Sequence, residues 1–199
     1  QLFQGINLGN GEEGLITYMR TDSTALSNES LSEIKNYVNK SYGDNYYESR
    51  KYKTKSANAQ EAHEAIRPTS INRTPDSIKS FLDDDQFKLY DLIWKRTVAS
   101  QMSESVNKKT TIITSSENRK YKFKSDYDEL TFDGFKKLFP EKESDKMPSI
   151  SEDDNVDLSK VDKEQKFTQH PPRYSESSLI KTLEDLWIGR PSTYASILN

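Results

Sequence analysis

Cysteine is absent from this sequence of 199 residues, so the chain can form neither disulfides nor thiolate metal sites. That absence fits a reducing compartment, and we expect a cytoplasmic protein. Long hydrophobic runs are also missing: no apolar stretch approaches the length needed to cross a bilayer, and no secretory signal is visible. Because an initiator methionine is lacking too, we expect the chain to be a piece of a longer protein.

A large charge of one sign is missing as well, since the formal net charge is -3. Any affinity for nucleic acid must therefore come from a local patch. Lysine and arginine outnumber acidic residues over positions 48–73, which include the run Arg50-Lys51-Tyr52-Lys53-Thr54-Lys55, whereas acidic residues dominate positions 141–164. We expect the first segment to attract an anionic partner and the second to repel it.

The hydrophobic pattern changes from helical to strand spacing near residue 105. Apolar residues at helical spacing predict helices over 28–42, from 74 onward with Ile78, Phe81 and Leu82 facing inward, and from 83 to about 102. Strands are predicted over 110–114, 120–124 and 130–135 and around Phe167.

Beyond these strands the chain returns to helices. The polar, acidic stretch 141–157 predicts an exposed and mobile connection. A helix is predicted from about residue 175, packed through Leu179, Leu183 and Leu186, and another after Pro191. The fold class is therefore α+β, with a helical domain over 1–104, a β-rich domain over 105–168 and the start of a second helical domain over 169–199.

Tyr18 lies two positions before Arg20 in the run Gly14-Leu15-Ile16-Thr17-Tyr18-Met19-Arg20-Thr21-Asp22-Ser23. We expect an extended segment, in which Tyr18 and Arg20 share one face. A phenol, with an ordinary pKa of about 10, becomes a useful nucleophile when a nearby cation stabilises its anion, and an arginine can also grip a phosphate oxygen. The alternative is that the tyrosine is structural and the arginine forms a surface ion pair with Asp22.

A second candidate segment is Asn58-Ala59-Gln60-Glu61-Ala62-His63-Glu64-Ala65-Ile66-Arg67-Pro68, which predicts a short polar helix or turn. His63 could donate a hydrogen bond to phosphate, and Arg67 would lie one helical turn further along the same face. Because an arginine stands where the His-Glu-x-x-His zinc motif needs its second histidine, no metal set is predicted. The alternative is a structural histidine with satisfied ring nitrogens.

A third candidate is the run Ile188-Gly189-Arg190-Pro191-Ser192-Thr193-Tyr194-Ala195-Ser196. The glycine permits a tight turn and the proline suits a first helical turn. The backbone amides of Ser192 and Thr193 could then face an anion beside Arg190. Such helix starts are common, so this motif indicates an anion-binding site only in combination with the other two segments.

Taken together and in this order, the three segments resemble the type IA DNA topoisomerases, most closely the bacterial topoisomerase I branch. The similarity runs from about Gly14 to the last residue. It implies that Tyr18 is the nucleophile that becomes linked to a DNA 5′-phosphate, and that Arg20 lies beside the scissile phosphate. Matches to family residues that contact DNA, together with the local positive charge, indicate six DNA-binding candidates: His63, Arg67, Arg190, Thr193, Lys51 and Lys53.

The resemblance also implies an activity and an architecture. The complete enzyme would cut one strand, pass another and reseal, relaxing negative supercoils with Mg²⁺ bound by acidic residues outside this chain, so the fragment alone would not relax DNA. The fold would be a helical winged-helix-like (CAP-like) domain followed by a β-rich hinge domain, within a padlock-like toroid. The partners would be DNA, single-stranded at the cleavage site, and the remaining domains of the same polypeptide. Leu186-Trp187 precedes Ile188 where the family often has a glycine, which would alter the approach to Arg190.

Two other readings compete with a topoisomerase I. One is a non-catalytic module for single-stranded DNA, in which Tyr18, Tyr46, Tyr47 and Tyr52 stack on bases and the basic run tracks phosphates. The other is a purely structural hinge fragment. Within the family, topoisomerase III and reverse gyrase share the tyrosine.

Overall fold

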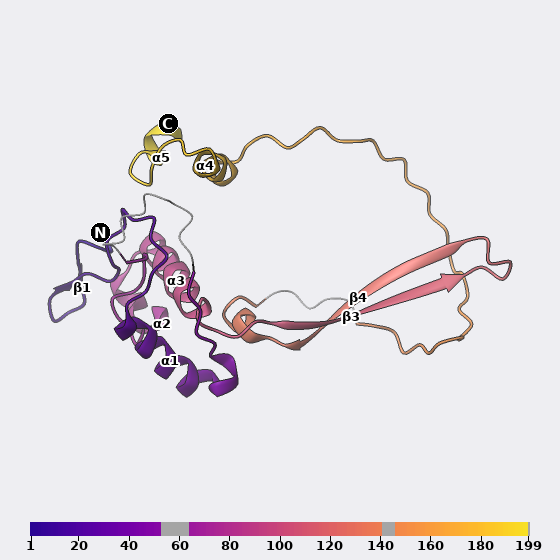
Figure 1. The fold of residues 1–199 in the computed structure, drawn as a ribbon, viewed down its shortest axis with the longest axis horizontal. Coiled ribbons are helices and arrows are strands. Elements are labelled where there is room, and N and C mark those ends of the chain that lie inside the picture. Colours follow the sequence, from indigo (N-terminus) through magenta and orange to yellow (C-terminus); the bar gives the residue numbers. More distant parts are fainter. Residues whose placement is uncertain (53–63, 141–145, 199) are drawn as a thin grey trace. The chain divides into compact units, whose positions relative to one another are not determined.

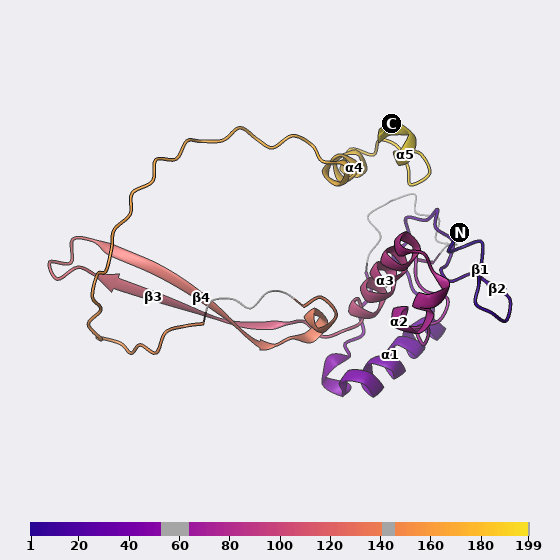
Figure 2. The ribbon, with the colours of Figure 1, turned by 180° about the vertical axis from the view of Figure 1, so that it is seen from behind.

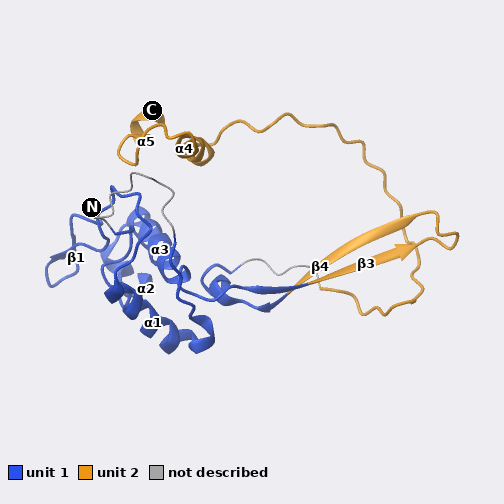
Figure 3. Ribbon diagram, viewed as in Figure 1, with its two compact units in different colours: residues 1–108, 130–143 blue, residues 109–129, 144–199 orange. Residues whose placement is uncertain are grey.

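The computed structural model describes residues 1–52, 64–140 and 146–198. These residues belong to two compact units, one formed by 1–108 with 130–143 and the other by 109–129 with 144–199 (Figure 3). Within the described parts of the chain, no helix is long and apolar enough to span a membrane. The division into domains at 104 and 168 stays a prediction.

The first unit is built on two helices, α1 (Asn28–Tyr42) and α3 (Asp84–Ala99), which lie side by side (Figures 1 and 2). Short helical turns accompany them: η1 (Asp44–Tyr46), α2 (Pro75–Ile78) and η2 (Lys79–Phe81). The rings of Tyr37 and Trp94 meet edge to face between the two long helices, with centroids 5.2 Å apart. The core of the unit consists of Leu2, Leu15, Ile16, Ile34, Val38, Ile71, Ile78, Tyr90, Trp94, Val98, Met102 and Leu138.

Local chemistry sets where the two long helices begin and end. The Ser27 hydroxyl accepts a hydrogen bond from the Ser30 amide at the start of α1, and Gly43 ends that helix with φ 103°. At the start of α3 a capping box forms, in which the Asp83 carboxylate accepts from the Gln86 amide and the Gln86 side-chain oxygen accepts from the Asp83 amide. The predictions of helices over 28–42 and from 83 onward are therefore confirmed, with α3 ending three residues earlier than expected.

One inward-facing residue was predicted wrongly in this unit. Ile78 is buried as expected, but Phe81 is 43% exposed. The backbone leaves helical geometry at Ile78, with φ -118° and ψ 6°, so the helical spacing does not continue to Phe81.

The described strands form two separate ribbons. Strands β1 (Ile6–Asn7) and β2 (Glu12–Glu13) pair antiparallel. Strands β3 (Val106–Ser115) and β4 (Lys122–Phe132) form a long hairpin (Figure 1). The strands predicted over 120–124 and 130–135 are thus one continuous strand, which ends where η3 (Gly134–Leu138) begins.

The base of this hairpin is bonded to the helical core. The Tyr46 hydroxyl donates to Asp133 Oδ1 at 2.6 Å, and the Phe135 amide donates to the Ser103 carbonyl at 2.9 Å. The bond from Tyr46, with help from the Lys137 ammonium, holds the pKa of Asp133 below its ordinary value. Gly134 is left-handed (φ 48°), and a Cβ there would collide with the Glu104 carbonyl.

The second unit contains the far part of the hairpin and the helices α4 (Glu176–Asp185) and α5 (Tyr194–Leu198). Both helices were expected. The strand predicted around Phe167 is wrong, because the described stretch 146–175 contains no helix or strand and Phe167 is 79% exposed. Leu186 is also wrong as a packing residue, since it lies past the last turn of α4 and is 62% exposed.

Candidate active site

Tyr18 lies on an irregular segment of the first unit. The expected strand is wrong: the chain forms an isolated bridge at Ile16 and bends at residues 17, 19 and 20. Leu15 and Ile16 are both buried, so the alternation of faces has stopped before the tyrosine. Tyr18 is 39% exposed and its ring meets Phe3 edge to face, with centroids 5.4 Å apart. The common face of Tyr18 and Arg20 stays a prediction.

The backbone before Tyr18 is tied to residues 65–69. Ile16 forms an antiparallel bridge with Pro68, and the flanking amides of Thr17 and Thr69 each donate across it, at 2.9 Å, to the carbonyls of Arg67 and Leu15. The Thr17 hydroxyl adds two further bonds: it donates to the Ala65 carbonyl at 2.7 Å and accepts from the Arg67 amide at 3.0 Å. Two segments about fifty residues apart in sequence therefore meet directly beside the tyrosine.

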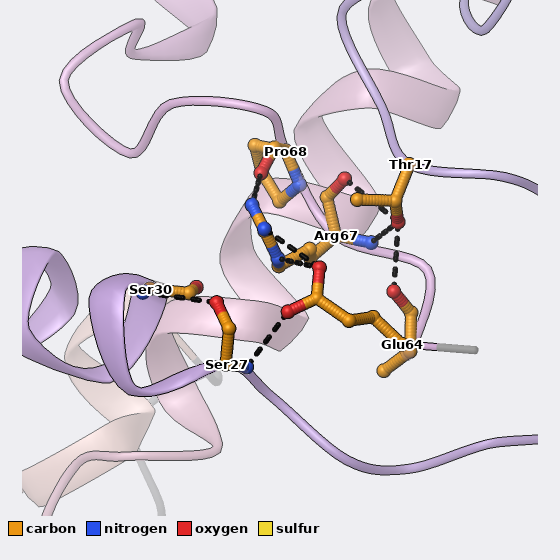
Figure 4. Close-up of polar contacts among 7 residues, drawn as sticks. Thr17, Ser27, Ser30, Glu64, Arg67 and Pro68 are labelled. Carbon is orange, nitrogen blue, oxygen red and sulfur yellow. Dashed lines mark hydrogen bonds and ion pairs between the residues drawn. The ribbon is translucent and has the colours of Figure 1, made fainter. Parts of the chain in front are cut away.

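Arg67 is held by a carboxylate and a carbonyl (Figure 4). Its Nε and Nη2 donate to Glu64 Oε2 at 3.1 and 2.7 Å, and its Nη1 donates to the Pro68 carbonyl at 2.9 Å. The arginine side chain is 15% exposed. Residues 64–68 contain no helix, so the helical turn expected at Arg67 is wrong.

Glu64 links this arginine to the start of α1. Its Oε1 accepts a hydrogen bond from the amide of Ser27, the residue that caps the helix (Figure 4). Burial opposes the charged form, but the hydrogen bonds from Ser27 and Arg67 outweigh it and hold the pKa of Glu64 below its ordinary value. The carboxylate is therefore charged at neutral pH and serves both partners.

The basic segment is partly neutralised within the protein. Arg50 contacts the Glu48 carboxylate at 2.6 Å and Glu104 at 3.5 Å, and Arg73 forms an ion pair with Glu13. Lys51 is exposed. Two of the predicted DNA-binding residues, Lys53 and His63, lie outside the described residues.

Arg190 and Thr193 lie together in a turn of the second unit. The Arg190 amide donates to the Thr193 hydroxyl at 2.9 Å, and the Thr193 amide donates to the Arg190 carbonyl at 2.8 Å. The Thr193 amide is therefore engaged within the turn, contrary to the expectation that it faces an anion. Gly189 is left-handed (φ 79°), as the predicted tight turn requires.

Trp187 stands at the position where the resemblance leads us to expect a glycine. The Trp187 amide donates to the Glu184 carbonyl at 3.1 Å and the Ile188 amide to the Leu183 carbonyl at 2.8 Å. These two bonds are the Schellman pattern that ends a helix, and it requires a left-handed residue. Trp187 has φ 62°, so a bulky side chain stands where glycine is favoured.

The residues that sequence reasoning missed are Thr17 and Glu64. Glu64 stands three positions before Arg67, a spacing that could have indicated an ion pair. Nothing in the sequence signals that Thr17 bonds to residues 65–67, because that contact depends on the tertiary fold. In the described ranges, no group of three or more His, Cys, Asp or Glu side chains is arranged to hold a metal ion.

Comparisons with known proteins agree on one family. The sequence matches the family model for DNA topoisomerase over residues 1–199. It is 48% identical to DNA topoisomerase 1 of Rickettsia conorii and 46% identical to that of Rickettsia bellii, over 100% of this chain and 27% and 26% of those proteins. The structure of full-length topoisomerase I from Thermotoga maritima superposes with a TM-score of 0.82 at 37% identity, covering 100% of this chain and 32% of that one.

The matched relatives are much longer than this chain, which spans about 27% of the length of the Rickettsia conorii protein. The match to the Thermotoga maritima structure also confirms the α+β class, since helices and a strand hairpin are both present. With a family model that covers every residue, the chain belongs to the DNA topoisomerase family, as a fragment of a bacterial type IA topoisomerase I.

Proposed function

We propose that this chain is the part of a type IA DNA topoisomerase that carries the nucleophile, Tyr18. The complete enzyme would cleave one DNA strand, hold the broken end, let another strand pass and reseal the break, which relaxes negative supercoils. One observation carries the proposal: Tyr18 is 39% exposed, directly after the buried residues Leu15 and Ile16 and the bonded Thr17. An accessible phenol on an anchored backbone suits attack on a macromolecular substrate.

The proposed reaction is a transesterification. The Tyr18 oxygen attacks the phosphorus and loses its proton, while the bond from phosphorus to the 3′-oxygen breaks and that oxygen leaves as a hydroxyl. Resealing is the reverse attack by the 3′-hydroxyl on the phosphotyrosine. Because one phosphodiester is exchanged for a similar ester, no nucleotide cofactor is needed. The Arg20 guanidinium would stabilise the charge on the phosphate oxygens during both steps.

The exposed polar residues Lys51, Arg190 and Thr193 would contact DNA, together with His63 and Lys53. Contacts of this kind to phosphate position a strand without reading its sequence. We propose that the bound DNA is single-stranded at the cleavage site, as the resemblance to type IA topoisomerases implies.

Magnesium would be bound in the complete enzyme by acidic residues outside this chain. We propose a winged-helix-like (CAP-like) arrangement for the helical unit and a hinge role for the hairpin, within a toroid completed by the rest of the polypeptide. The bonds at the hairpin base, from Tyr46 to Asp133 and from Phe135 to Ser103, support a defined pivot there. The absence of cysteine supports a cytoplasmic location.

The competing function is a non-catalytic module for single-stranded DNA. Two of its four stacking tyrosines, Tyr46 and Tyr47, pack against the hydrophobic core. Tyr52 is 50% exposed but donates its hydroxyl to the Ser100 carbonyl at 2.9 Å. The module would therefore depend on Tyr18 and Tyr52, which is a short stacking surface.

Tyr18→Phe in a full-length topoisomerase carrying this chain tests the proposal. We expect complete loss of the covalent adduct with a 3′-labelled single strand on a denaturing gel, because the labelled 3′ portion is the part that stays on the tyrosine. DNA affinity should change less than about 3-fold, since the ring remains. Tyr121→Phe, a change at another exposed tyrosine, is the matched control. Adduct formation by Tyr18→Phe would overturn the proposal. Absence of any adduct in the parent enzyme, with DNA affinity kept, would favour the stacking module.

A further inference from the structure

Thr17 is the residue directly before the proposed nucleophile, and its amide and hydroxyl are both bonded to one segment. Its amide donates to the Arg67 carbonyl, while its hydroxyl donates to the Ala65 carbonyl and accepts from the Arg67 amide, over distances of 2.7 to 3.0 Å. A hydroxyl that both donates and accepts fixes its side chain in one rotamer. The backbone that leads into Tyr18 is therefore held in place by residues 65–67.

The segment 65–67 is in turn held by the Arg67 and Glu64 side chains (Figure 4). The guanidinium bonds to the Glu64 carboxylate and to the next carbonyl in the chain, and the other oxygen of the carboxylate accepts from Ser27 at 2.8 Å. This series of bonds connects the start of α1 to the residue beside Tyr18. The side chains of Arg67 and Glu64 are 15% and 32% exposed, so solvent screens the ion pair only in part.

We propose that Thr17, Glu64 and Arg67 are positioning residues for Tyr18, an inference that rests on the proposed role of Tyr18 as nucleophile. The tyrosine lies on neither a helix nor a strand, so the bonds of the Thr17 amide and hydroxyl help to hold it where a regular element does not. In-line attack needs the phenol oxygen near the phosphorus in one orientation, and a shift of about 1 Å can cost about 100-fold in rate. On this view Arg67 acts through Thr17 and not by gripping DNA.

The first test compares three threonine variants of a full-length topoisomerase carrying this chain. Thr17→Val removes the hydroxyl at nearly constant volume, and Thr17→Ser keeps it. Thr69→Val is the matched control, because the Thr69 hydroxyl donates to the Gly14 carbonyl at 2.9 Å on the same bridge but does not adjoin Tyr18. The measurements are the single-turnover rate of adduct formation at saturating single-stranded DNA, the dissociation constant for that DNA and the unfolding temperature.

We expect Thr17→Val to slow adduct formation about 10-fold to 100-fold with a dissociation constant within about 3-fold of the parent. Thr17→Ser should restore the rate to within about 3-fold, and Thr69→Val should leave it unchanged although it too lowers the unfolding temperature. Parental cleavage by Thr17→Val, or equal losses in both valine variants, would overturn the proposal. Tyr18→Phe is measured in parallel to separate the positioning proposal from the proposed function. Adduct formation by that variant would show that Tyr18 is not the nucleophile.

A second test, Glu64→Gln, distinguishes a role of Arg67 in positioning Tyr18 from a role in binding DNA. It also tests the proposal if the Thr17→Val variant does not fold. Removing this negative charge should strengthen DNA binding if Arg67 grips DNA, and cleavage would then be kept or improved. If Glu64 and Arg67 position Tyr18, the same change should lower the cleavage rate about 10-fold at unchanged affinity. Glu48→Gln is the matched control, because Glu48 also pairs with an arginine, and among the described residues no bond joins it to Thr17, Glu64 or Arg67. Improved cleavage by Glu64→Gln would contradict the inference.

Discussion

The two tryptophans, Trp94 and Trp187, differ widely in solvent exposure. Trp94 is 4% exposed, and its indole Nε1 donates to the Ile71 carbonyl at 2.9 Å. Trp187 is 64% exposed. The buried tryptophan therefore supplies both apolar area and a hydrogen bond to a backbone carbonyl between α3 and the loop before α2, while the indole of Trp187 buries much less of its surface.

Trp94→Phe should lower the free energy of unfolding by about 1–3 kcal/mol, because the Ile71 carbonyl loses its hydrogen bond inside the core. Chemical denaturation followed by circular dichroism measures this change without relying on tryptophan fluorescence. Trp187→Phe is the matched control and should stay within about 0.5 kcal/mol of the parent. Equal effects of the two substitutions would show that the Trp94 bond contributes nothing.

The arginines of the basic segment, positions 48–73, are paired with acidic residues of the same chain. Arg50, Arg67 and Arg73 each pair with a carboxylate in the described structure. Charge counted along the sequence therefore overstates the positive potential available to DNA over positions 48–73.

At the scale of elements, α4 ends on an unusual residue. Its last turn closes in a Schellman pattern, and the left-handed position holds Trp187 with φ 62°. A left-handed conformation costs a residue with a Cβ about 1–2 kcal/mol, whereas glycine adopts it freely. The bonds of the pattern offset this cost, so the helix keeps its stop signal without glycine.

Trp187→Gly should therefore stabilise the end of α4 by about 1 kcal/mol, after allowing for the greater flexibility of glycine in the unfolded chain. Hydrogen exchange followed by mass spectrometry should show about 5-fold slower exchange of the amides over residues 183–188. Leu186→Gly is the control, because Leu186 has an ordinary φ of -90° and glycine there should speed exchange. Faster exchange in Trp187→Gly would contradict the strain at this position.

At the scale of the whole molecule, the chain covers about a quarter of a topoisomerase. It matches 27% of the Rickettsia conorii protein and 32% of the Thermotoga maritima chain. The proposed nucleophile and arginine lie within that part, whereas the proposed magnesium ligands lie outside it. Cleavage without a means to hold, pass and reseal strands does not change DNA topology.

The isolated chain should therefore leave negatively supercoiled plasmid unrelaxed in the presence of Mg²⁺. Agarose gel electrophoresis resolves the topoisomers, and a full-length topoisomerase carrying the same chain is the positive control. A ladder of discrete relaxed topoisomers produced by the chain alone would contradict this division of the active site.

The helices were predicted well because their signals are local. Helix caps and helical spacing act within a few residues, so they can be recognised in the sequence. Examples are the caps Ser27 and Asp83 and the spacing of Ile34 and Val38. The strand around Phe167 failed because strands are stabilised by a partner strand, and a local pattern cannot supply one. The prediction of an extended strand around Tyr18 was wrong for the same reason, since the strand pairing of this segment is a single bridge from Ile16 to Pro68.

The sequence by itself determined the family, the proposed chemistry of Tyr18 and Arg20, and the main helices, because motifs and helix caps consist of neighbouring residues. Only the tertiary structure decided that Thr17 bonds to residues 65–67 and that Glu64 accepts a hydrogen bond from Ser27 at the start of α1. The Thr17 contacts join residues 48 and 50 positions apart and the Ser27–Glu64 contact joins residues 37 positions apart, so their geometry follows from how the core brings these segments together. The residues next to Tyr18 in sequence therefore identify it as the candidate nucleophile, whereas residues distant in sequence hold its backbone in place.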